Sequence, residues 1–273
     1  MLVLCAGMLR SGSTFQYNLV SSLVEDNAVA VRHGQVDLKA DWLSNPDLAG
    51  WARDEKVFHV IKDHIEDCPR LGPRELEMVQ TGRIKICYIH RDIRDVAASA
   101  KEVWRLDTTT LWDRLDRAVT TYDLLRDTPG VLRQRYEEVT VDVGRAVREI
   151  ARFLGLEPTA ASVESIVQRC SLEAMDVFSR SKRFVLYHTL RNAVVRAVPA
   201  ALRFRWPALL VPLRFDRRTL VGGQHISSTR GSAGAWRAKL TPEEQDLITA
   251  RYRAYLLRAG YSLSAVNPIA PSA

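Results

Sequence analysis

The chain has 273 residues, of which 47% are hydrophobic and 26% are charged. This composition is typical of a globular protein with a sizeable core, and it excludes bulk disorder. The net charge of +7 is uneven, because residues 177–240 hold thirteen Lys or Arg residues and one acid, Asp216. Such a segment indicates either a local anionic partner or a solvated arginine-rich face.

Four cysteines lie far apart in the sequence, without metal-ligand spacing. We therefore expect a reducing compartment and no disulfide framework. The first residues form a strand-like run without the basic region or cleavage site of a signal peptide. No uncharged apolar run reaches the length of about 18 residues that a membrane-spanning helix needs. These features predict a cytoplasmic protein without a transmembrane segment.

Apolar patterning predicts strands that alternate with helices. Strands are expected over residues 2–6, 57–62, 84–90 and, more weakly, 131–136; helices are expected over residues 13–24, 93–105, 111–126, 143–154 and 241–259. This alternation is typical of an α/β fold with a doubly wound parallel sheet. The length fits one domain over residues 1–273.

Residues 178–223 differ from the rest of the chain. Arginines alternate there with apolar residues, and Pro199, Pro207 and Pro212 interrupt any helical pattern. We expect a basic, apolar helical lid or acceptor-binding segment inserted in the domain. The pattern leaves open whether it contacts an acceptor, a membrane surface or only the site that it covers.

A glycine-rich turn joins the first strand to the first helix. It runs from Gly7 to Thr14, and its spacing approaches that of a nucleotide-binding P-loop. Backbone N–H groups and the helix N-terminus of such a loop favour a phosphate or sulfate. Ser13 stands in the place of the P-loop lysine, and Arg10 supplies a cation earlier in the loop. An ordinary strand–turn–helix corner is the alternative.

Two further strands end in polar residues. The strand over residues 57–62 leads into Lys62, Asp63 and His64, and the strand over residues 84–90 leads into Arg91. The carboxyl ends of parallel strands form the ligand-binding edge of such a sheet. There a histidine can act as a general base and a lysine can stabilise charge on a leaving oxygen.

Arg91 is followed two helical turns later by Ser99, on roughly the same side of the predicted helix. An arginine and a hydroxyl that converge in this way can bind a second, separate phosphate. Helix-capping charge and a surface serine would explain the same residues without a ligand.

In this order, these motifs resemble the PAPS-dependent sulfotransferase family, where PAPS is 3′-phosphoadenosine-5′-phosphosulfate. The resemblance implies a P-loop-like fold and a 5′-phosphosulfate loop made of Arg10, Ser11, Gly12, Ser13, Thr14 and Phe15, with Phe15 placed to stack on adenine. It also implies a 3′-phosphate site at Arg91 and Ser99, and an adenine contact at Tyr136. Residues 229–237 resemble the segment that closes over the 3′-phosphate, which implies contacts from Arg230 and Gly231, although Thr229 and Ala235 depart from that motif.

The resemblance implies in-line transfer of a sulfuryl group from PAPS to a hydroxyl or amine, with release of 3′-phosphoadenosine-5′-phosphate (PAP). His64 would be the base, and Lys62 and Arg10 would stabilise the leaving group, so we expect no metal. Members with an arginine in the loop often use a carboxylate base. Asp63 and Glu66 are therefore alternatives to His64.

Two other functions fit the sequence less well. An ATP-dependent P-loop kinase would normally carry the lysine that Ser13 replaces, and it would need magnesium. A non-catalytic nucleotide-binding protein of the same fold is the second alternative.

We expect a small-molecule, carbohydrate or lipid-linked acceptor, and peripheral membrane contact is left open. We expect no nucleic-acid partner, because no recognised nucleic-acid motif is present. The sequence does not specify the acceptor or the oligomeric state.

Overall fold

A computed structural model describes residues 1–38, 41–65, 71–171, 173–174, 229 and 231–264. The segment over residues 178–223, together with Glu66 and Arg230, lies outside the described residues. In the described part, five parallel strands form one sheet in the order β2-β3-β1-β4-β5. Their bounds are Leu2–Gly7 (β1), Ala30–Gln35 (β2), Phe58–Lys62 (β3), Ile84–His90 (β4) and Val131–Arg135 (β5).

The central strand β1 is buried along its whole length. It pairs with β3 on one side and with β4 on the other, so the strand order reverses at β1. In open α/β sheets a crevice forms beyond the carboxyl ends of the strands at such a reversal. The loops after β3, β1 and β4 therefore open onto the same edge of the sheet.

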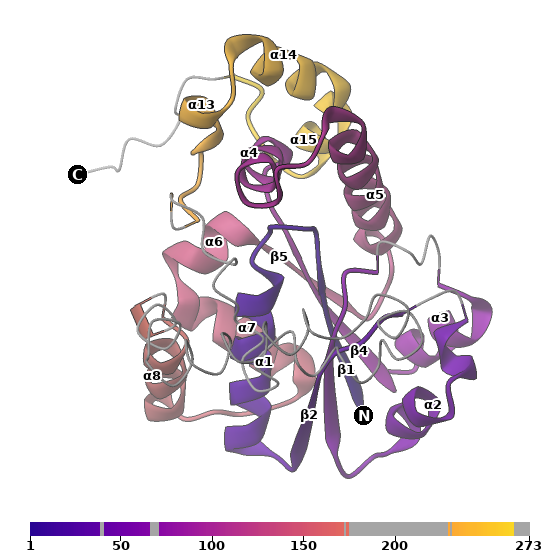
Figure 1. Cartoon of the computed structure of the whole chain (residues 1–273). Coiled ribbons are helices and arrows are strands. Elements are labelled where there is room, and N and C mark those ends of the chain that lie inside the picture. Colours follow the sequence, from indigo (N-terminus) through magenta and orange to yellow (C-terminus); the bar gives the residue numbers. More distant parts are fainter. Residues whose placement is uncertain (39–40, 66–70, 172, 175–228, 230, 265–273) are drawn as a thin grey trace, which may run out of the picture.

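Helices cover both faces of the sheet (Figure 1). One set contains α1 (Ser13–Asn27), α6 (Tyr136–Val141), α7 (Val143–Leu154) and α8 (Ala160–Arg169); the other contains η1 (Trp42–Ser44), α2 (Pro46–Arg53), α3 (Pro73–Gln80) and α5 (Thr108–Arg126). The helices α4 (Ile93–Trp104), α13 (Trp236–Lys239), α14 (Pro242–Arg251) and α15 (Arg253–Arg258) gather at the carboxyl end of the sheet, at the top of Figure 1. The predicted doubly wound α/β fold is confirmed.

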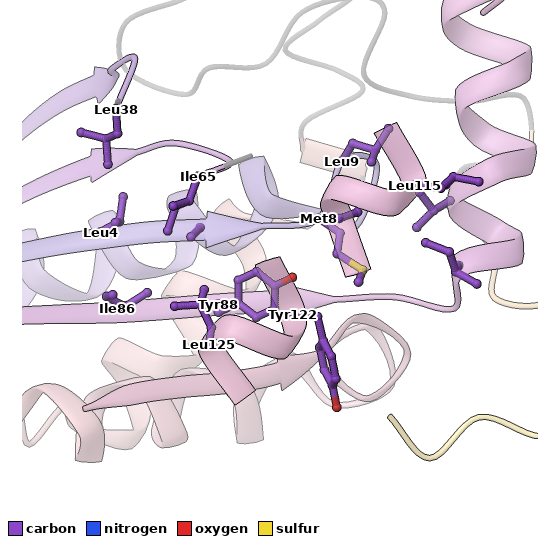
Figure 2. Close-up of a cluster of buried hydrophobic side chains, with 14 of the residues drawn as sticks. Leu4, Met8, Leu9, Leu38, Ile65, Ile86, Tyr88, Leu115, Tyr122 and Leu125 are labelled. Atoms are coloured by element: carbon purple, nitrogen blue, oxygen red, sulfur yellow. The ribbon is translucent and has the colours of Figure 1, made fainter. Parts of the chain in front are cut away.

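Alternate residues of β1 enter two separate hydrophobic clusters. Leu2 and Leu4 pack with α2, α4, α5 and the C-terminal helices, whereas Val3 and Cys5 pack with α1, α7 and α8. Figure 2 shows part of the first cluster, in which Leu4 of β1 and Leu125 of α5 belong to the same core. Burial of one large aliphatic side chain contributes about 1.5–3 kcal/mol, so these two clusters rigidly support the strand that carries the glycine-rich loop.

Several predicted boundaries differ from the structure; the helix expected over residues 13–24, for example, extends to Asn27. Tyr136 begins α6 and does not end β5. The predicted helix over residues 241–259 is interrupted at Tyr252, although Thr241 forms the expected N-cap, with a complete capping box to Glu244. The predicted helix starting at Leu111 begins three residues earlier, because the Asp107 side chain caps it by accepting from the N–H of Thr110. None of the described helices combines the length and the apolar character needed to cross a membrane.

Candidate active site

The glycine-rich loop after β1 is held in shape by Ser11. Its hydroxyl oxygen lies 2.7 Å from the carbonyl oxygen of Met8 and 3.0 Å from that of Ile89. Its backbone N–H donates to the same carbonyl oxygen of Met8. Ser11 is completely buried. Its hydroxyl and N–H groups therefore make buried hydrogen bonds that fix the loop's conformation. The predicted contact of Ser11 with a nucleotide remains a prediction.

Gly12 lets the loop turn into α1. It has a φ of 85°, in the left-handed region, and a Cβ there would lie 2.7 Å from the ring of Tyr136. Glycine alone combines this φ with so close an approach at little cost. The helix α1 begins with Ser13, Thr14 and Phe15, and its N-cap, Gly12, has no side chain to accept from their N–H groups. These groups have no helical acceptor of their own and carry the positive end of the helix dipole, as an anion site requires.

Arg10 connects this loop to α4. Its Nε donates to the hydroxyl oxygen of Ser99 at 3.0 Å, and its guanidinium lies 5.7 Å from the ring centre of Trp104. Arg91 in turn donates from Nη1 to the carbonyl oxygen of Arg10 at 3.2 Å. Arg10 therefore lies between the two residues that were predicted to bind a second phosphate. Burial and the charge of Arg91 lower the pKa of Arg10 from its ordinary value.

Lys62 and His64 extend from the end of β3 toward the same loop. The Nδ1 atom of His64 lies 2.8 Å from the carbonyl oxygen of Gly7, and its Nε2 atom lies 3.4 Å from Lys62 Nζ. A carbonyl can only accept, so Nδ1 carries the proton and Nε2 keeps a lone pair. Lys62 itself is buried, and its register partner in β1 is Cys5. Lys62 and His64 therefore lie close together, as the sequence predicts.

Asp63 fixes the loop that presents His64. Its carboxylate accepts from the N–H of Ile65 at 2.6 Å and from the N–H of Leu38 at 3.2 Å. Burial raises the pKa of Asp63 to about 6, against the effect of these two bonds. Ile65 has a φ of 56°, which is costly for a β-branched residue, and it lies directly after His64.

The guanidinium of Arg91 lies between the loop and a C-terminal segment. Its Nη2 donates to the carbonyl oxygens of Gly231 and Ser232, each at 3.0 Å, and the group lies 4.4 Å from the ring centre of Tyr136. Among the described residues, the buried Nε of Arg91 has no hydrogen-bond partner. A buried donor without a partner is costly in a native protein unless a ligand or water completes it.

Tyr136 separates two glycines of the predicted site. A Cβ on Gly231 would lie 2.2 Å from the Tyr136 hydroxyl oxygen, and a Cβ on Gly12 would lie 2.7 Å from Cδ2 and Cε2 at the edge of the same ring. Burial raises the pKa of Tyr136, so the phenol is neutral near pH 7. Phe15 is half-buried and packs against the second hydrophobic cluster. A role for Phe15 in stacking on adenine remains a prediction.

Sequence reasoning missed the role of one acid beside the site, Asp95, and gave no contact for another, Glu137, which lies in the run Tyr136-Glu137-Glu138 that resembles the family's tyrosine–glutamate step. Asp95 accepts from backbone N–H groups of the C-terminal segment, and Glu137 accepts from the N–H of Asp92 at 3.1 Å. The available signal was the position of Asp95 in the first turn of the helix expected over residues 93–105, where an acid is favoured. Within the described residues, no group of three or more His, Cys, Asp or Glu side chains is arranged to hold a metal ion.

A scan against protein-family models matches residues 2–196 to the sulfotransferase domain. The chain belongs to the sulfotransferase family. Its activity class is therefore sulfuryl transfer, and the P-loop kinase considered from the loop spacing does not apply. A search of curated proteins finds no significant match.

Solved structures of similar fold include three with a bound ligand. Mouse sulfotransferase SULT7A1 in complex with PAP has a TM-score of 0.57 at 17% identity, with 96% of this chain and 89% of that chain covered. Retinol dehydratase with androsterone and the inactive cofactor PAP has a TM-score of 0.55 at 17% identity, covering 93% and 80%. Retinol dehydratase with retinol and PAP has a TM-score of 0.53 at 17% identity, covering 93% and 81%. These similarities show a shared fold.

Proposed function

We propose that this sulfotransferase uses PAPS as its sulfuryl donor and releases PAP. The observation that carries the proposal is the contact of Arg10 with both Ser99 and Arg91. It brings the loop after β1 next to Arg91, just before α4, and Ser99, on α4, the two residues that we propose bind the second anion. PAPS carries a phosphosulfate at its 5′ end and a phosphate at its 3′ position, so it requires two such sites.

The residues present fit a nucleotide of this kind. The first N–H groups of α1 and the cations Arg10 and Lys62 suit the 5′-phosphosulfate, and the unpartnered Nε of Arg91 suits the 3′-phosphate. Tyr136 and Phe15 are the aromatic groups expected near the adenine. The relatives of similar fold hold PAP, which agrees with this choice of donor.

We assign the base to His64. Its Nε2 lone pair faces the region of Lys62 and the loop, whereas both oxygens of Asp63 already accept backbone N–H groups. In the reaction, the acceptor oxygen or nitrogen forms a bond to sulfur, and the bond from sulfur to the bridging phosphate oxygen breaks. His64 Nε2 takes the acceptor proton, while Lys62 and Arg10 stabilise the charge that grows on the bridging oxygen. These two cations would perform the task that a metal ion performs elsewhere.

For the acceptor, we propose a small molecule with a hydroxyl or amine group. The retinol dehydratase structures hold androsterone in one case and retinol in the other, and those ligands support a small acceptor for this fold. Carbohydrate and lipid-linked acceptors share the same reacting group and belong in the first screen.

Transfer of label from ³⁵S-PAPS into a panel of alcohols, phenols, sugars, amines and cell extract tests the proposal. We expect labelled product and an equal amount of PAP, both absent with His64→Asn. If PAP binds tightly and no label is transferred, the chain is a nucleotide-binding protein without this activity. If neither binding nor transfer occurs, the proposal is wrong.

A further inference from the structure

Asp95 lies in the first turn of α4, four residues after Arg91, and only 2% of it is exposed. One carboxylate oxygen accepts from the N–H of Gly234 at 2.7 Å, and the other accepts from the N–H of Trp236 at 2.9 Å. Its distance of 3.9 Å to Arg91 Nη2 is long for an ion pair. Two charge-assisted bonds to the backbone are therefore its main contacts.

Arg91 contacts the same C-terminal segment, residues 231–236, through backbone carbonyl groups, whereas Asp95 contacts it through N–H groups. Arg91 donates to the carbonyl oxygens of Gly231 and Ser232, whereas Asp95 accepts from the N–H groups of residues 234 and 236. Arg94 adds a third contact, because its guanidinium lies 4.1 Å from the ring centre of the buried Trp236. Arg91, just before α4, and two residues of its first turn, Arg94 and Asp95, thus contact residues 231–236 from Gly231 to Trp236.

This fixed segment reaches the candidate nucleotide site at Gly231. The Tyr136 hydroxyl occupies the space that a side chain at position 231 would take, and Tyr136 also contacts Gly12 of the loop. The position of the segment is therefore set by backbone contacts, and Thr229 and Ala235 replace the basic and acidic residues expected there from the family pattern.

Asp95 places a buried negative charge beside the candidate anion site at Arg91. A negative charge 3.9 Å from Arg91 repels an approaching phosphate, so it should weaken binding if charge alone mattered. We propose that Asp95 is a positioning residue that holds residues 231–236 beside Arg91, and that this placement sets the selectivity for a nucleotide with a 3′-phosphate. The inference rests on the proposed use of PAPS.

The substitution Asp95→Asn separates placement from charge, because the two explanations predict opposite results. An amide keeps the shape but has one acceptor oxygen for two N–H groups. We expect the affinity ratio of PAP to AMP to fall by about tenfold, the usual effect of losing one strong hydrogen bond, with the AMP affinity little changed. A ratio that stays constant or rises would show that Asp95 acts only through its charge or only on stability.

Controls keep the outcome clear. Asp142→Asn makes the same chemical change at the N-cap of α7, away from the site, and should leave the ratio unchanged. If Asp95→Asn does not fold, Gly231→Ala disturbs the same segment through Tyr136, and an unchanged ratio there would overturn the proposal. A wild-type chain without preference for PAP over AMP would refute the use of PAPS. A wild-type preference that Asp95→Asn retains would refute only the role of Asp95.

Discussion

The imidazole of His64 and the carbonyl oxygen of Gly7 lie 2.8 Å apart, although 57 residues separate them in the chain. This bond places the proton on Nδ1 and orients Nε2 toward Lys62. It joins the loop after β3 to the last residue of β1. The candidate base is thus positioned by the same strand that carries the anion loop.

Replacement of His64 by Ala should abolish transfer and leave PAP affinity nearly unchanged. A positioned general base contributes about 10²–10⁴-fold to a rate, and the anion contacts lie on other residues. Label transfer and calorimetric PAP binding measure the two effects. The control His33→Ala removes a half-buried histidine of β2 outside the site. Equal loss of transfer and PAP binding in the His64 variant would exclude His64 as the base.

Replacement of Gly12 by Ala should destabilise the chain more than replacement of Gly155 by Ala. Both glycines have a positive φ, which costs about 1 kcal/mol for alanine. Only at Gly12 would the new methyl group meet Tyr136 at 2.7 Å, since Gly155 has open space around it. Overpacking adds about 1–3 kcal/mol. Urea unfolding compares the two variants, and equal losses would show that the Tyr136 contact does not matter.

His90 should make the fold sensitive to acid. Burial, aided by Arg135 and Arg133, lowers the pKa of His90 to about 3 in the folded chain. Below the ordinary histidine pKa of about 6.5 the unfolded chain binds a proton that the folded chain does not, so stability is lost as pH falls from there toward 3. Between pH 7 and pH 5 the expected loss is about 2 kcal/mol.

The variant His90→Phe should lose less stability over this pH range, because phenylalanine does not titrate. Urea unfolding at pH 7, 6 and 5 provides the comparison. The absolute stability at pH 7 can fall through loss of the contact between His90 and Tyr261. Only the change with pH bears on the prediction, and an identical change in both chains would contradict it.

Replacement of Lys62 by Met should lower the turnover of PAPS more than its binding. The lysine is buried at the end of β3 beside His64, where its charge is expected to act on the leaving oxygen. Loss of one such electrostatic contact typically costs about 10²–10³-fold in turnover. Steady-state kinetics with PAPS varied separates kcat from KM. A change confined to KM would assign Lys62 to donor binding alone.

The parts of the fold that the sequence predicts best are those with one dominant signal. The strands β1 and β4 are buried apolar runs, and a glycine turn or a polar helix start follows each. By contrast, β2 contains Arg32, His33 and Gly34, lies at the edge of the sheet and shifts register between Arg32 and Gly34. Apolar and polar residues therefore do not alternate regularly along β2, and this alternation is the sequence signal that indicates a strand.

Among the short helices that went unpredicted, three carry a start signal. Asn45 with Pro46 begins α2, Pro73 begins α3, and the Thr159 side chain caps α8. These helices have only eight to ten residues, so their apolar periodicity extends over few turns and gives weak evidence. Their N-terminal residues would have been the better guide.

The site was predictable where its residues follow strand ends directly. Arg10, His64 and Arg91 come after three adjacent strands, and the topology alone brings them together. The link from Arg10 to Ser99 and the role of Asp95 depend on side-chain directions and on a segment far along the chain. Local patterns contain no information on such contacts.

Calorimetric titration of PAP and ADP, with chelator present, tests the central claim most directly. The two nucleotides carry the same number of phosphate groups, but only PAP has one at the 3′ position. We predict that PAP binds at least about tenfold more tightly, and that Arg91→Gln removes most of this difference, since a charged hydrogen bond is worth about 1.5–3 kcal/mol. Equal affinity for PAP and ADP in the wild-type chain would contradict the account.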